Sequence, residues 1–541
     1  MSSIGLREQS HITNPVPWLY RFGPLIPTLC DLAFVLPVFV LFWSTTGVGW
    51  LLTDSDTGWH IRTGEWILSH GHIPKIDIFS FTMAGRPWLA WEWLSDIALA
   101  LAHRLGGLAG VVWVAMLLLG ATSVCTYKAA KEECGHRLIA LALTWLAMSA
   151  STIHWLARPH LVTPLMAAVF CRVLNSVEKK RKSQALWGLP LLTIVWTNLH
   201  GGFFVGIVLI CTYAIGAAAE ELLRGSQENL WRRLRPFVLA GVGCMLASLL
   251  NPYGYRLHLH VAQYLGASFY FVRISEFQSI DFHSFTAAYF ETLLILAIAA
   301  AAWHLRSGRL IHALLLLSWS HLALFSARNI PIFAVVVVPG VGLAMRDWLD
   351  GWKWVTCFKA SVEDLESGLR LLAERFRTKS WHFAPSLMVL ALAFGFAHPG
   401  HWKQLEAGFD DSRFPVGAAT FLSEQSHLPS LRLYSSWQWG GYLIYRLWPS
   451  LSVFDDGRTD FYGPGFVNEG LAVWNGNPDW SRILDQYQVN AALLPVDSAL
   501  ASVIRERDDW KPIYQDRVAV LFARVESGRL IGHCGGPHVE H

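Results

Sequence analysis

The stretch that decides the fold is residues 28–62, which read TLCDLAFVLPVFVLFWSTTGVGWLLTDSDTGWHIR. Its first part, 28–52, is long and apolar enough to cross a bilayer, because a membrane helix needs about 20 apolar residues. The apolar run ends at two carboxylates, Asp54 and Asp56. A span followed at once by an acidic pair places that pair at a membrane surface.

The composition of the whole chain agrees with a membrane protein. Of 541 residues, 53% are hydrophobic and 15% are charged, and the mean hydropathy is +0.35. Soluble domains carry roughly 25% charged residues. This composition argues against a disordered chain and against a partner that is a nucleic acid. The eight cysteines form no CxxC motif, so we expect free thiols rather than a disulfide framework or a zinc site.

The fold class predicted from the apolar runs is a polytopic α-helical membrane protein with about 11 transmembrane helices. The runs lie near residues 28–52, 108–127, 137–156, 160–177, 185–199, 202–221, 236–250, 286–304, 309–326, 330–345 and 382–398. Segment 91–105 contains Glu92, Asp96, His103 and Arg104. We therefore expect an interfacial helix there rather than a span.

The distribution of Lys and Arg sets the expected orientation. Cytoplasmic loops carry an excess of these residues. With the N-terminus in the cytoplasm, the basic run 179–182 and the basic segment 346–379 lie inside, and the outer loops hold few cations. The sequence thus predicts a multi-pass protein of the cytoplasmic (inner) membrane, with a cytoplasmic N-terminus and an extracytoplasmic C-terminal domain.

After about residue 400 the chain becomes more polar. Short apolar runs such as LSVF (451–454) and VAVLF (518–522) favour strands, and helix-like stretches separate them. We therefore divide the chain into a transmembrane domain, 1–400, with a long first outer loop at 53–107, and a C-terminal soluble α/β domain, 401–541.

Polar residues gather at the outer ends of several predicted spans. Besides the first outer loop, they lie in the motifs ARPH (157–160), NLHGG (198–202), NPYGYR (251–256) and SARN (326–329). Ionisable residues at membrane depth are costly and usually functional. Any one of them can be an ordinary cap at the end of a span. Several segments that share one surface favour a common site.

The acidic pair Asp54 and Asp56 is the candidate catalytic centre. Two carboxylates at this spacing can ligate one divalent cation such as Mg²⁺ or Mn²⁺, or one can act as a base while the other orients it. They can also cap the helix that follows. No cofactor is required by the sequence. Predicted substrate contacts come from the same loop and from neighbouring motifs: His60, Arg62, Asp77, Trp88, Glu92, His160 and Asn198.

Cationic side chains at the same surface form a candidate anion site, namely Arg158, His200, Arg273 and Arg328. The planar guanidinium of Arg matches phosphate oxygens, and a polyprenyl phosphate needs such a pocket above an apolar groove. The two glycines after His200 would let the backbone approach a ligand closely. The alternatives are a hydrogen-bonded packing role for His200 and a snorkelling role for Arg328.

The order of these features resembles the GT-C superfamily of integral-membrane glycosyltransferases. The string DSDTGWHIRTGEWI…IPKIDIFSFT…GRPW…EWL in the first outer loop is similar to a group of uncharacterised bacterial GT-C-like proteins, and the resemblance covers roughly residues 25–400. It implies a sugar donor on polyprenyl phosphate and Asp54 or Asp56 as the base. It also implies that the donor phosphate is held by Arg328, Arg158, His200 or Arg273.

A looser similarity lies in YSSWQWGGYLIYRL (434–447). Oligosaccharyltransferases carry a WWDYG motif that contacts the acceptor, but here the acidic residue is missing. The charged segment FDDGRTDFYG (454–463) can bind carbohydrate, or it can be a turn with an internal Arg–Asp pair.

The function we expect is transfer of a sugar from a polyprenyl-phosphate donor to a glycan, lipid or protein acceptor on the outer face. The stereochemical outcome implied by the resemblance is inversion. A transporter or lipid flippase is the less favoured alternative. Such proteins tend to contain internal repeats and polar residues at mid-membrane, whereas the polar groups here gather at one face. A non-catalytic scaffold with the same fold stays open, since one sequence does not separate it from an active enzyme.

Overall fold

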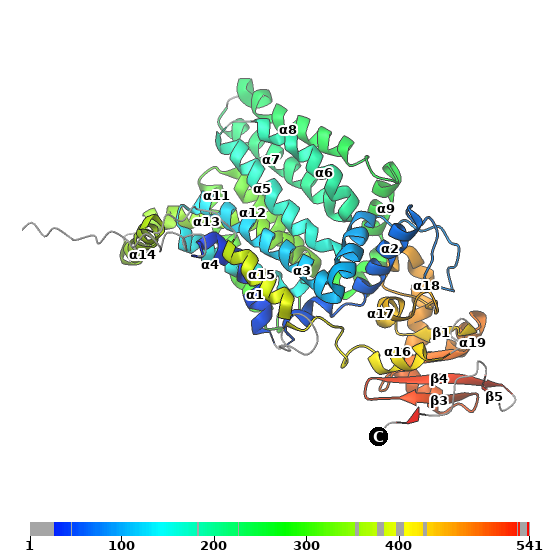
Figure 1. The fold of residues 1–541 in the computed structure, drawn as a ribbon. Coiled ribbons are helices and arrows are strands. Elements are labelled where there is room, and N and C mark those ends of the chain that lie inside the picture. Colours follow the sequence, from blue (N-terminus) through cyan, green and yellow to red (C-terminus); the bar gives the residue numbers. More distant parts are fainter. Residues whose placement is uncertain are drawn as a thin grey trace, which may run out of the picture.

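The structure, a computed structural model, describes residues 26–44, 46–180, 183–225, 227–351, 356–375, 384–396, 405–425, 430–526, 529–530 and 538–539. It consists of a bundle of helices and a smaller unit with a sheet at one end of it (Figure 1). Helix α14 (Thr356–Arg375) lies at the opposite end of the bundle. Helix α14 and the C-terminal sheet are therefore at opposite ends of the protein.

The helices of the bundle follow one another with short connections, many of them 3₁₀ turns. The longer helices are α1 (Leu29–Trp43), α2 (Asp56–His70), α3 (Trp93–Cys134), α4 (Arg137–Ser151), α5 (Val162–Lys180), α6 (Gly188–Leu199), α7 (Phe204–Leu223), α8 (Gln227–Ala247), α9 (Tyr255–Gly266), α11 (Ala287–Arg306), α12 (Leu310–Phe325), α13 (Ile330–Gly351) and α15 (Ala384–Phe396). Helix α10 (Ser268–Arg273) and the 3₁₀ turns η7 (Ser275–Phe277) and η8 (Ala327–Asn329) lie near the site described below.

Every apolar segment named above falls on a helix, although the helices differ in length. Within the described residues, six helical segments are long and apolar enough to cross a membrane: Trp93–Cys134, Arg137–His154, Pro159–Lys179, Gly201–Leu223, Ala287–Arg306 and Ala327–Gly351. Helices α1, α12 and α15 are apolar but shorter. The chain is a multi-pass membrane protein, and the number of eleven spans stays a prediction.

The segment expected to be interfacial is the first part of α3. The helix bends at Gly106 and Gly107, where the backbone leaves the helical range and Gly107 has a φ of +57°. Glycine adopts this conformation without steric cost. The polar part of α3 before the bend packs against α2. A Cβ on Gly64 of α2 would lie 1.9 Å from the carbonyl oxygen of Asp96, so glycine permits the two helices to cross closely.

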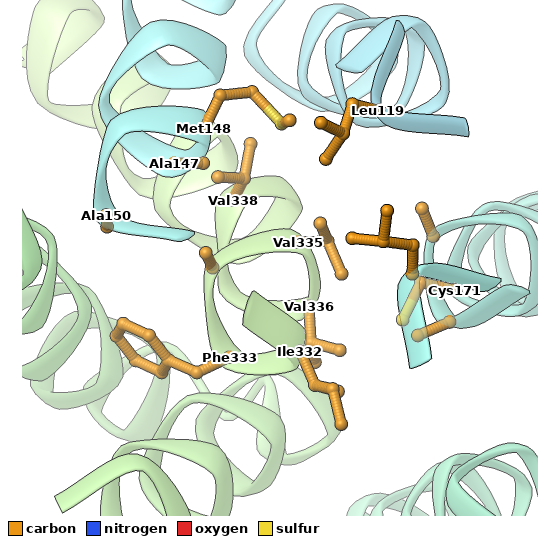
Figure 2. Packing of buried hydrophobic residues seen from close by; sticks show 14 of the residues in the cluster. Leu119, Ala147, Met148, Ala150, Cys171, Ile332, Phe333, Val335, Val336 and Val338 are labelled. Carbon is orange, nitrogen blue, oxygen red and sulfur yellow. The ribbon is translucent and has the colours of Figure 1, made fainter. Parts of the chain in front are cut away.

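The core of the bundle is centred on α13. All of its residues from Ile330 to Ala344 are buried, as expected for a helix that is apolar on every side. Figure 2 shows its side chains packed among Leu119 of α3, Met148 of α4 and Cys171 of α5. The described cysteines, including Cys171, are free thiols. Helix α13 begins directly after the turn η8, so it fixes the position of the SARN motif that contains this turn.

The C-terminal unit is a mixed sheet covered by helices. Its strands are β1 (Leu433–Ser435), β2 (Ala491–Pro495), β3 (Trp510–Gln515), β4 (Ala519–Glu526), β5 (Arg529–Leu530) and β6 (His538–Val539), and its helices are α16 (Val416–Ser423), α17 (Trp437–Leu447), α18 (Thr459–Trp474), α19 (Trp480–Gln486) and α20 (Ala499–Arg505). The strand order is β1-β2-β4-β3-β6, with β5 paired to β4. Strand β2 pairs parallel with β1 and antiparallel with β4. The predicted boundary near residue 400 lies outside the described residues.

The first outer loop is built into the core of this unit. Phe79 and Trp88 of the loop belong to the same buried cluster as Leu433 and Leu493 of the sheet. The loop also forms a bridge between Ser80 and Val453. Helix α17 packs on α2, as Figure 1 shows. The loop and the C-terminal unit therefore have to fold together.

A buried arginine joins the two segments. Arg458 lies in the C-terminal unit, and its Nη2 donates to Asp77 Oδ1 of the first outer loop at 2.9 Å and to Asp456 Oδ2 at 2.6 Å. Its guanidinium carbon lies 4.5 Å from the centre of the Trp88 ring. Removing one partner of a buried ion pair typically costs about 3–5 kcal/mol, because the remaining charges stay buried.

We expect Arg458→Met to lower the thermal unfolding midpoint of the detergent-purified protein by several degrees and to raise hydrogen exchange across residues 75–90. The reason is that Asp77 and Asp456 lose their shared cation. The matched control is Arg482→Met, which removes an exposed pair with Asp479 and is expected to cost less than about 1 kcal/mol. Equal effects of the two variants would contradict the anchoring role of Arg458.

Candidate functional site

A polar cavity of about 700 Å³ lies where α2, the start of α3, the turns η7 and η8 and the C-terminal unit meet. Ten of the residues predicted from the sequence line it: Asp54, Asp56, His60, Trp88, Glu92, Arg158, His160, His200, Arg273 and Arg328. The structure thus brings together the first outer loop and the ARPH, NLHGG and SARN motifs. These segments are far apart in the chain, and helices α3, α5 and α13 place them next to one another.

The acidic pair is held by Arg158. Its Nη1 donates to Asp54 Oδ2 at 2.5 Å, and its Nη2 lies 3.1 Å from Asp56 Oδ2. Glu276 of η7 lies 3.5 Å from the same guanidinium. Asp54 also accepts the backbone N–H of Asp56 through Oδ1 at 2.8 Å, so it helps to open α2 as well as binding Arg158. Both oxygens of Asp54 are therefore engaged, which makes it an orienting group.

Asp56 is the candidate base of the acidic pair. Burial and the neighbouring Asp54 raise its pKa to about 7, although Arg158 acts in the opposite direction. The C-terminal unit covers it closely, because a Cβ on Gly457 would lie 1.9 Å from Asp56 Oδ1. A carboxylate with a pKa near neutral pH, at the wall of a cavity, is suited to accept a proton.

A divalent cation on Asp54 and Asp56 does not fit this arrangement. Both carboxylates are occupied by the guanidinium of Arg158. In the part of the chain that the structure describes, three or more His, Cys, Asp or Glu side chains nowhere come together in a group able to hold a metal ion. We therefore derive no chemical step through a metal.

Glu92, His60 and His200 form the floor of the cavity. Glu92 Oε1 lies 3.4 Å from His200 Nε2, and Glu92 Oε2 lies 3.9 Å from His60 Nε2. Burial raises the pKa of Glu92 to about 8 and lowers the pKa of both histidines. The floor is thus made of groups that are neutral near pH 7, and each can exchange hydrogen bonds with a bound molecule.

The glycines after His200 are needed for close packing within the protein rather than for the approach of a ligand. A Cβ on Gly201 would lie 2.3 Å from the Trp91 ring, and one on Gly202 would lie 2.4 Å from Thr163 Oγ1. His200 Nδ1 accepts the backbone N–H of Gly202 at 3.0 Å. His200 is therefore hydrogen-bonded within the protein and also lines the cavity. The packing role and the anion-site role considered for it are compatible with each other.

An apolar groove of about 300 Å³ opens beside the polar cavity. Its walls include Leu119 of α3, Met148 of α4, Val208 of α7 and Val335 of α13. Five residues line both spaces: Trp91, His160, His200, Tyr264 and Arg328. The groove therefore reaches the polar cavity at a junction that carries a cation, two imidazoles and a phenol.

Two arginines supply positive charge to the cavity. Within the described residues, neither Arg328 nor Arg273 forms an ion pair with a carboxylate. The guanidinium of Arg328 instead lies 5.1 Å from the centre of the Phe277 ring, and that of Arg273 lies 6.0 Å from the centre of the Phe269 ring. Guanidinium groups held by aromatic faces remain available for an anion.

Three predicted substrate contacts lie outside the cavity. Arg62 donates to the backbone carbonyl of Tyr445 and to Glu65. Asp77 belongs to the buried ion cluster of Arg458. Asn198 accepts from Trp93 Nε1 at 2.9 Å and donates to two backbone carbonyls. In this arrangement all three connect structural elements.

Sequence reasoning missed several residues of the cavity, namely Asp96, Tyr264, Glu276, Gly457 and Asp460. Tyr264 lies in α9 and Glu276 in η7, in a stretch of ordinary composition, and Gly457 has no chemistry of its own. The density of charge in residues 454–463 was the available signal for Asp460. Nothing in the spacing indicated that this segment would cover Asp56.

Comparison with solved structures identifies the fold. The apo oligosaccharyltransferase of Archaeoglobus fulgidus matches with a TM-score of 0.54 and 10% identity over 89% of this chain and 70% of that chain. The same enzyme with an inhibitory peptide and a dolichol-phosphate matches with a TM-score of 0.53, 9% identity and the same coverage. A complex with Zn and sulfate also matches, with a TM-score of 0.54 and 11% identity over 87% and 67% of the two chains.

ArnT from Cupriavidus metallidurans, bound to undecaprenyl phosphate, matches with a lower TM-score of 0.44 and 15% identity over 90% of this chain and 98% of that chain. No protein-family profile and no curated protein matches the sequence. The three matches to the oligosaccharyltransferase confirm the fold expected from the resemblance. At such low identity the similarity establishes the fold, and the chemistry has to be argued from the site.

We expect Gly457→Ala to disturb the contact between the C-terminal unit and Asp56, because its Cβ would overlap the carboxylate. Overpacking of this kind costs about 1–3 kcal/mol. The expected result is a lower thermal midpoint and faster hydrogen exchange in residues 53–62. Gly465→Ala is the control, since a Cβ there meets no atom within 4 Å. Unchanged exchange in Gly457→Ala would show that Asp56 is not covered in this way.

Proposed function

We propose that the protein is a membrane glycosyltransferase that takes a sugar from a polyprenyl-phosphate donor. The observation that carries this proposal is the junction between the apolar groove and the polar cavity, at Arg328 and His200. A lipid phosphate has an apolar chain joined to an anion, and the two spaces match these parts in the same order. The dolichol-phosphate in one of the matched oligosaccharyltransferase structures belongs to this class of ligand.

The donor phosphate would be held by Arg328 and His200, with Arg273 on the outer side of the cavity. Arg328 and Arg273 provide guanidinium groups that form no ion pair with a carboxylate among the described residues, and neutral His200 provides an N–H at Nε2, because its Nδ1 accepts a backbone N–H. Arg158 is less suited to the phosphate, since Asp54, Asp56 and Glu276 already neutralise it. Its role is to hold the acidic pair.

The proposed reaction is an inverting displacement at the anomeric carbon of the sugar. A hydroxyl group of the acceptor attacks C1, and Asp56 accepts the hydroxyl proton. The bond between C1 and the phosphate oxygen breaks, and the polyprenyl phosphate leaves with the electron pair. Arg328 stabilises the charge that develops on the phosphate. Asp54 and Arg158 keep Asp56 in place.

The acceptor would enter from the side of the C-terminal unit. Trp437, Gln438, Thr459 and Asp460 line this wall of the cavity, and Trp437 is 41% exposed. An exposed Trp beside hydroxyl and carboxylate groups suits a carbohydrate or another polar acceptor. The proposal leaves the acceptor as a glycan, a lipid or a protein.

The location we propose is the cytoplasmic (inner) membrane, with the N-terminus in the cytoplasm and the cavity at the outer surface. The support is the position of α14 with its basic residues at the end opposite the C-terminal unit (Figure 1). The excess of Lys and Arg on one side determines orientation in such proteins. A scaffold that keeps this fold without turnover is the remaining alternative, and an activity measurement separates the two.

Native mass spectrometry of the detergent-purified protein tests the lipid site. Wild type is expected to carry a polyprenyl phosphate or its sugar adduct after incubation with undecaprenyl phosphate. Arg328→Ala is expected to lose at least about 90% of the bound lipid, because one charge-assisted contact with phosphate is worth about 1.5–3 kcal/mol. Arg256→Ala removes an outer-face arginine that lines neither space, so it should bind as wild type does. Equal occupancy in all three proteins would refute the phosphate site at Arg328.

Turnover tests the role of Asp56. Purified protein is mixed with a panel of polyprenyl-phosphate sugars and a membrane extract as the source of acceptor, and released polyprenyl phosphate is measured. Loss of a general base typically lowers the rate about 10²–10⁴-fold. The turnover rate of Asp56→Asn should therefore be at least about 100-fold below that of wild type. Because the base must be ionised, the wild-type rate should rise with pH through about 7. Full activity of Asp56→Asn would remove it as the base, and no turnover by wild type with any donor would favour the scaffold.

A further inference from the structure

A third cavity, of about 500 Å³, lies at the end of the bundle away from the polar cavity. It is formed by the 3₁₀ turn η5 (Ser183–Trp187) and by one face of α8. The residues that determine its chemistry are Leu186, Trp187, Trp231, Arg232, Arg235 and Leu239. None of them lines the polar cavity or the apolar groove, so the proposed reaction does not use this space.

The level of this cavity in the membrane follows from helices α6 and α8, which run side by side in the same direction. At their ends, the Asn198 side chain donates to the carbonyl of Leu250 at 3.0 Å, and it accepts from Trp93 next to the polar cavity. At 1.5 Å per residue, Arg232 lies roughly 25 Å from Leu250. The hydrocarbon core of a bilayer is about 30 Å thick, so the third cavity and the polar cavity lie near opposite membrane surfaces.

The arginines of α8 have different surroundings. Arg233 is buried, and its guanidinium lies 2.6 Å from Glu220 and 3.0 Å from Glu221 of α7. Arg232 and Arg235 lie three residues apart on another face of α8, where they are exposed and line the cavity. Among the described residues, neither of these two arginines forms an ion pair or a hydrogen bond. Arg233 thus occupies the nearby carboxylates, and the two exposed cations have no counter-ion there.

Two tryptophans lie beside these cations. Trp187 and Trp231 are 62% and 63% exposed, and within the described part of the chain neither indole N–H has a hydrogen-bond partner. Tryptophan is enriched where a membrane meets water, because its ring is apolar and its N–H is polar. The cavity therefore offers two cations and two N–H donors at the depth of the lipid headgroups.

An exposed apolar surface continues from the cavity toward the middle of the membrane. Leu239 lines the cavity, and the exposed Val242 follows one turn later on α8. Leu191 of α6 is also exposed. A Cβ on Gly243 would lie 3.1 Å from the ring of Pro190, so α6 and α8 touch just below the cavity. The close contact leaves a shallow apolar surface there, which suits extended acyl chains.

We propose that this cavity binds the headgroup of an anionic glycerophospholipid, with the phosphate between Arg232 and Arg235 and the acyl chains along Leu239 and Val242. Guanidinium groups and indole N–H groups both donate to phosphate oxygens. Basic pockets between membrane helices are known binding sites for such headgroups. The ligand differs from the proposed sugar donor, because it is a phosphodiester with two acyl chains and lies at the other membrane surface.

Charge and shape favour this ligand over related ones. A zwitterionic lipid such as phosphatidylcholine would bring a quaternary ammonium group close to Arg232 and Arg235, and these like charges repel. A soluble phosphate compound would satisfy the two cations but would gain nothing from the apolar surface at Leu239. An anionic phospholipid matches the cations, the tryptophans and the apolar surface in their order along the helices.

Native mass spectrometry of the full-length protein in a nonionic detergent tests the site with dioleoyl phosphatidylglycerol and dioleoyl phosphatidylcholine. Wild type should bind one phosphatidylglycerol at least about tenfold more tightly than phosphatidylcholine, because two arginines contribute. Arg232→Gln and Arg235→Gln should each weaken phosphatidylglycerol binding about fivefold, the effect expected of one basic residue near an anionic lipid. Binding of phosphatidylcholine should not change.

Arg306→Gln is the matched control. Arg306 is an exposed arginine at the end of α11 and lies outside the cavity. It belongs to the same end of the bundle, because the backbone N–H of the nearby Ile311 donates to Glu220 beside Arg233. This variant should bind phosphatidylglycerol as wild type does. The substituted side chains are all exposed, so the three variants should keep the thermal midpoint of wild type.

Three results would overturn the proposal. The first is equal affinity of wild type for the two lipids. The second is binding by Arg232→Gln and Arg235→Gln that equals that of Arg306→Gln. The third is displacement of the lipid by glycerophosphoglycerol as effectively as by phosphatidylglycerol, since a soluble phosphate compound would then be the ligand. All three measurements are independent of glycosyl transfer, so a failure of the proposed function leaves this site to be judged by itself.

Discussion

Arg458 holds the first outer loop against the C-terminal unit, and the polar cavity exists because these two segments are held together. The guanidinium is buried between Asp77 of the loop and Asp456 of its own segment, and Trp88 covers its face. Gly457, the residue before it, is in turn pressed against Asp56. One short segment therefore contains both the structural ion cluster and the glycine that covers a candidate catalytic carboxylate.

The cavity combines charges of both signs, and their pairing determines what each group can do. Arg158 is shared by Asp54, Asp56 and Glu276 and is thereby neutralised. Among the described residues, Arg328 contacts an aromatic ring and forms no ion pair with a carboxylate. Burial is the main cause that raises the pKa of Glu92 and lowers the pKa of His200, and the positive charges of Arg328 and Arg158 lower the pKa of His200 further. The proposed division between an acidic side for the acceptor and a cationic side for the lipid phosphate follows from these pairings.

The sequence predicted the helical membrane fold, because hydropathy and charge are local properties of the chain. It also identified ten residues of the cavity, among them Asp54, Asp56, Arg158, His200 and Arg328, because these lie at the ends of predicted spans. It did not separate Asp77, Arg62 and Asn198 from the cavity, since a polar residue near the membrane surface has the same local signal whether it faces a cavity or a neighbouring helix. Asp96 and the covering Gly457 gave no signal of their own.

What the sequence by itself determined is therefore the class of fold and the surface on which the site lies. Apolar runs that are long enough to span a bilayer, and polar groups at their ends, require no knowledge of packing. What only the tertiary structure decided is which charges are paired, that Gly457 covers Asp56, and that a groove meets the cavity at His200 and Arg328. These properties depend on contacts between residues that are up to several hundred positions apart, such as Asp77 with Arg458, and no local pattern specifies them.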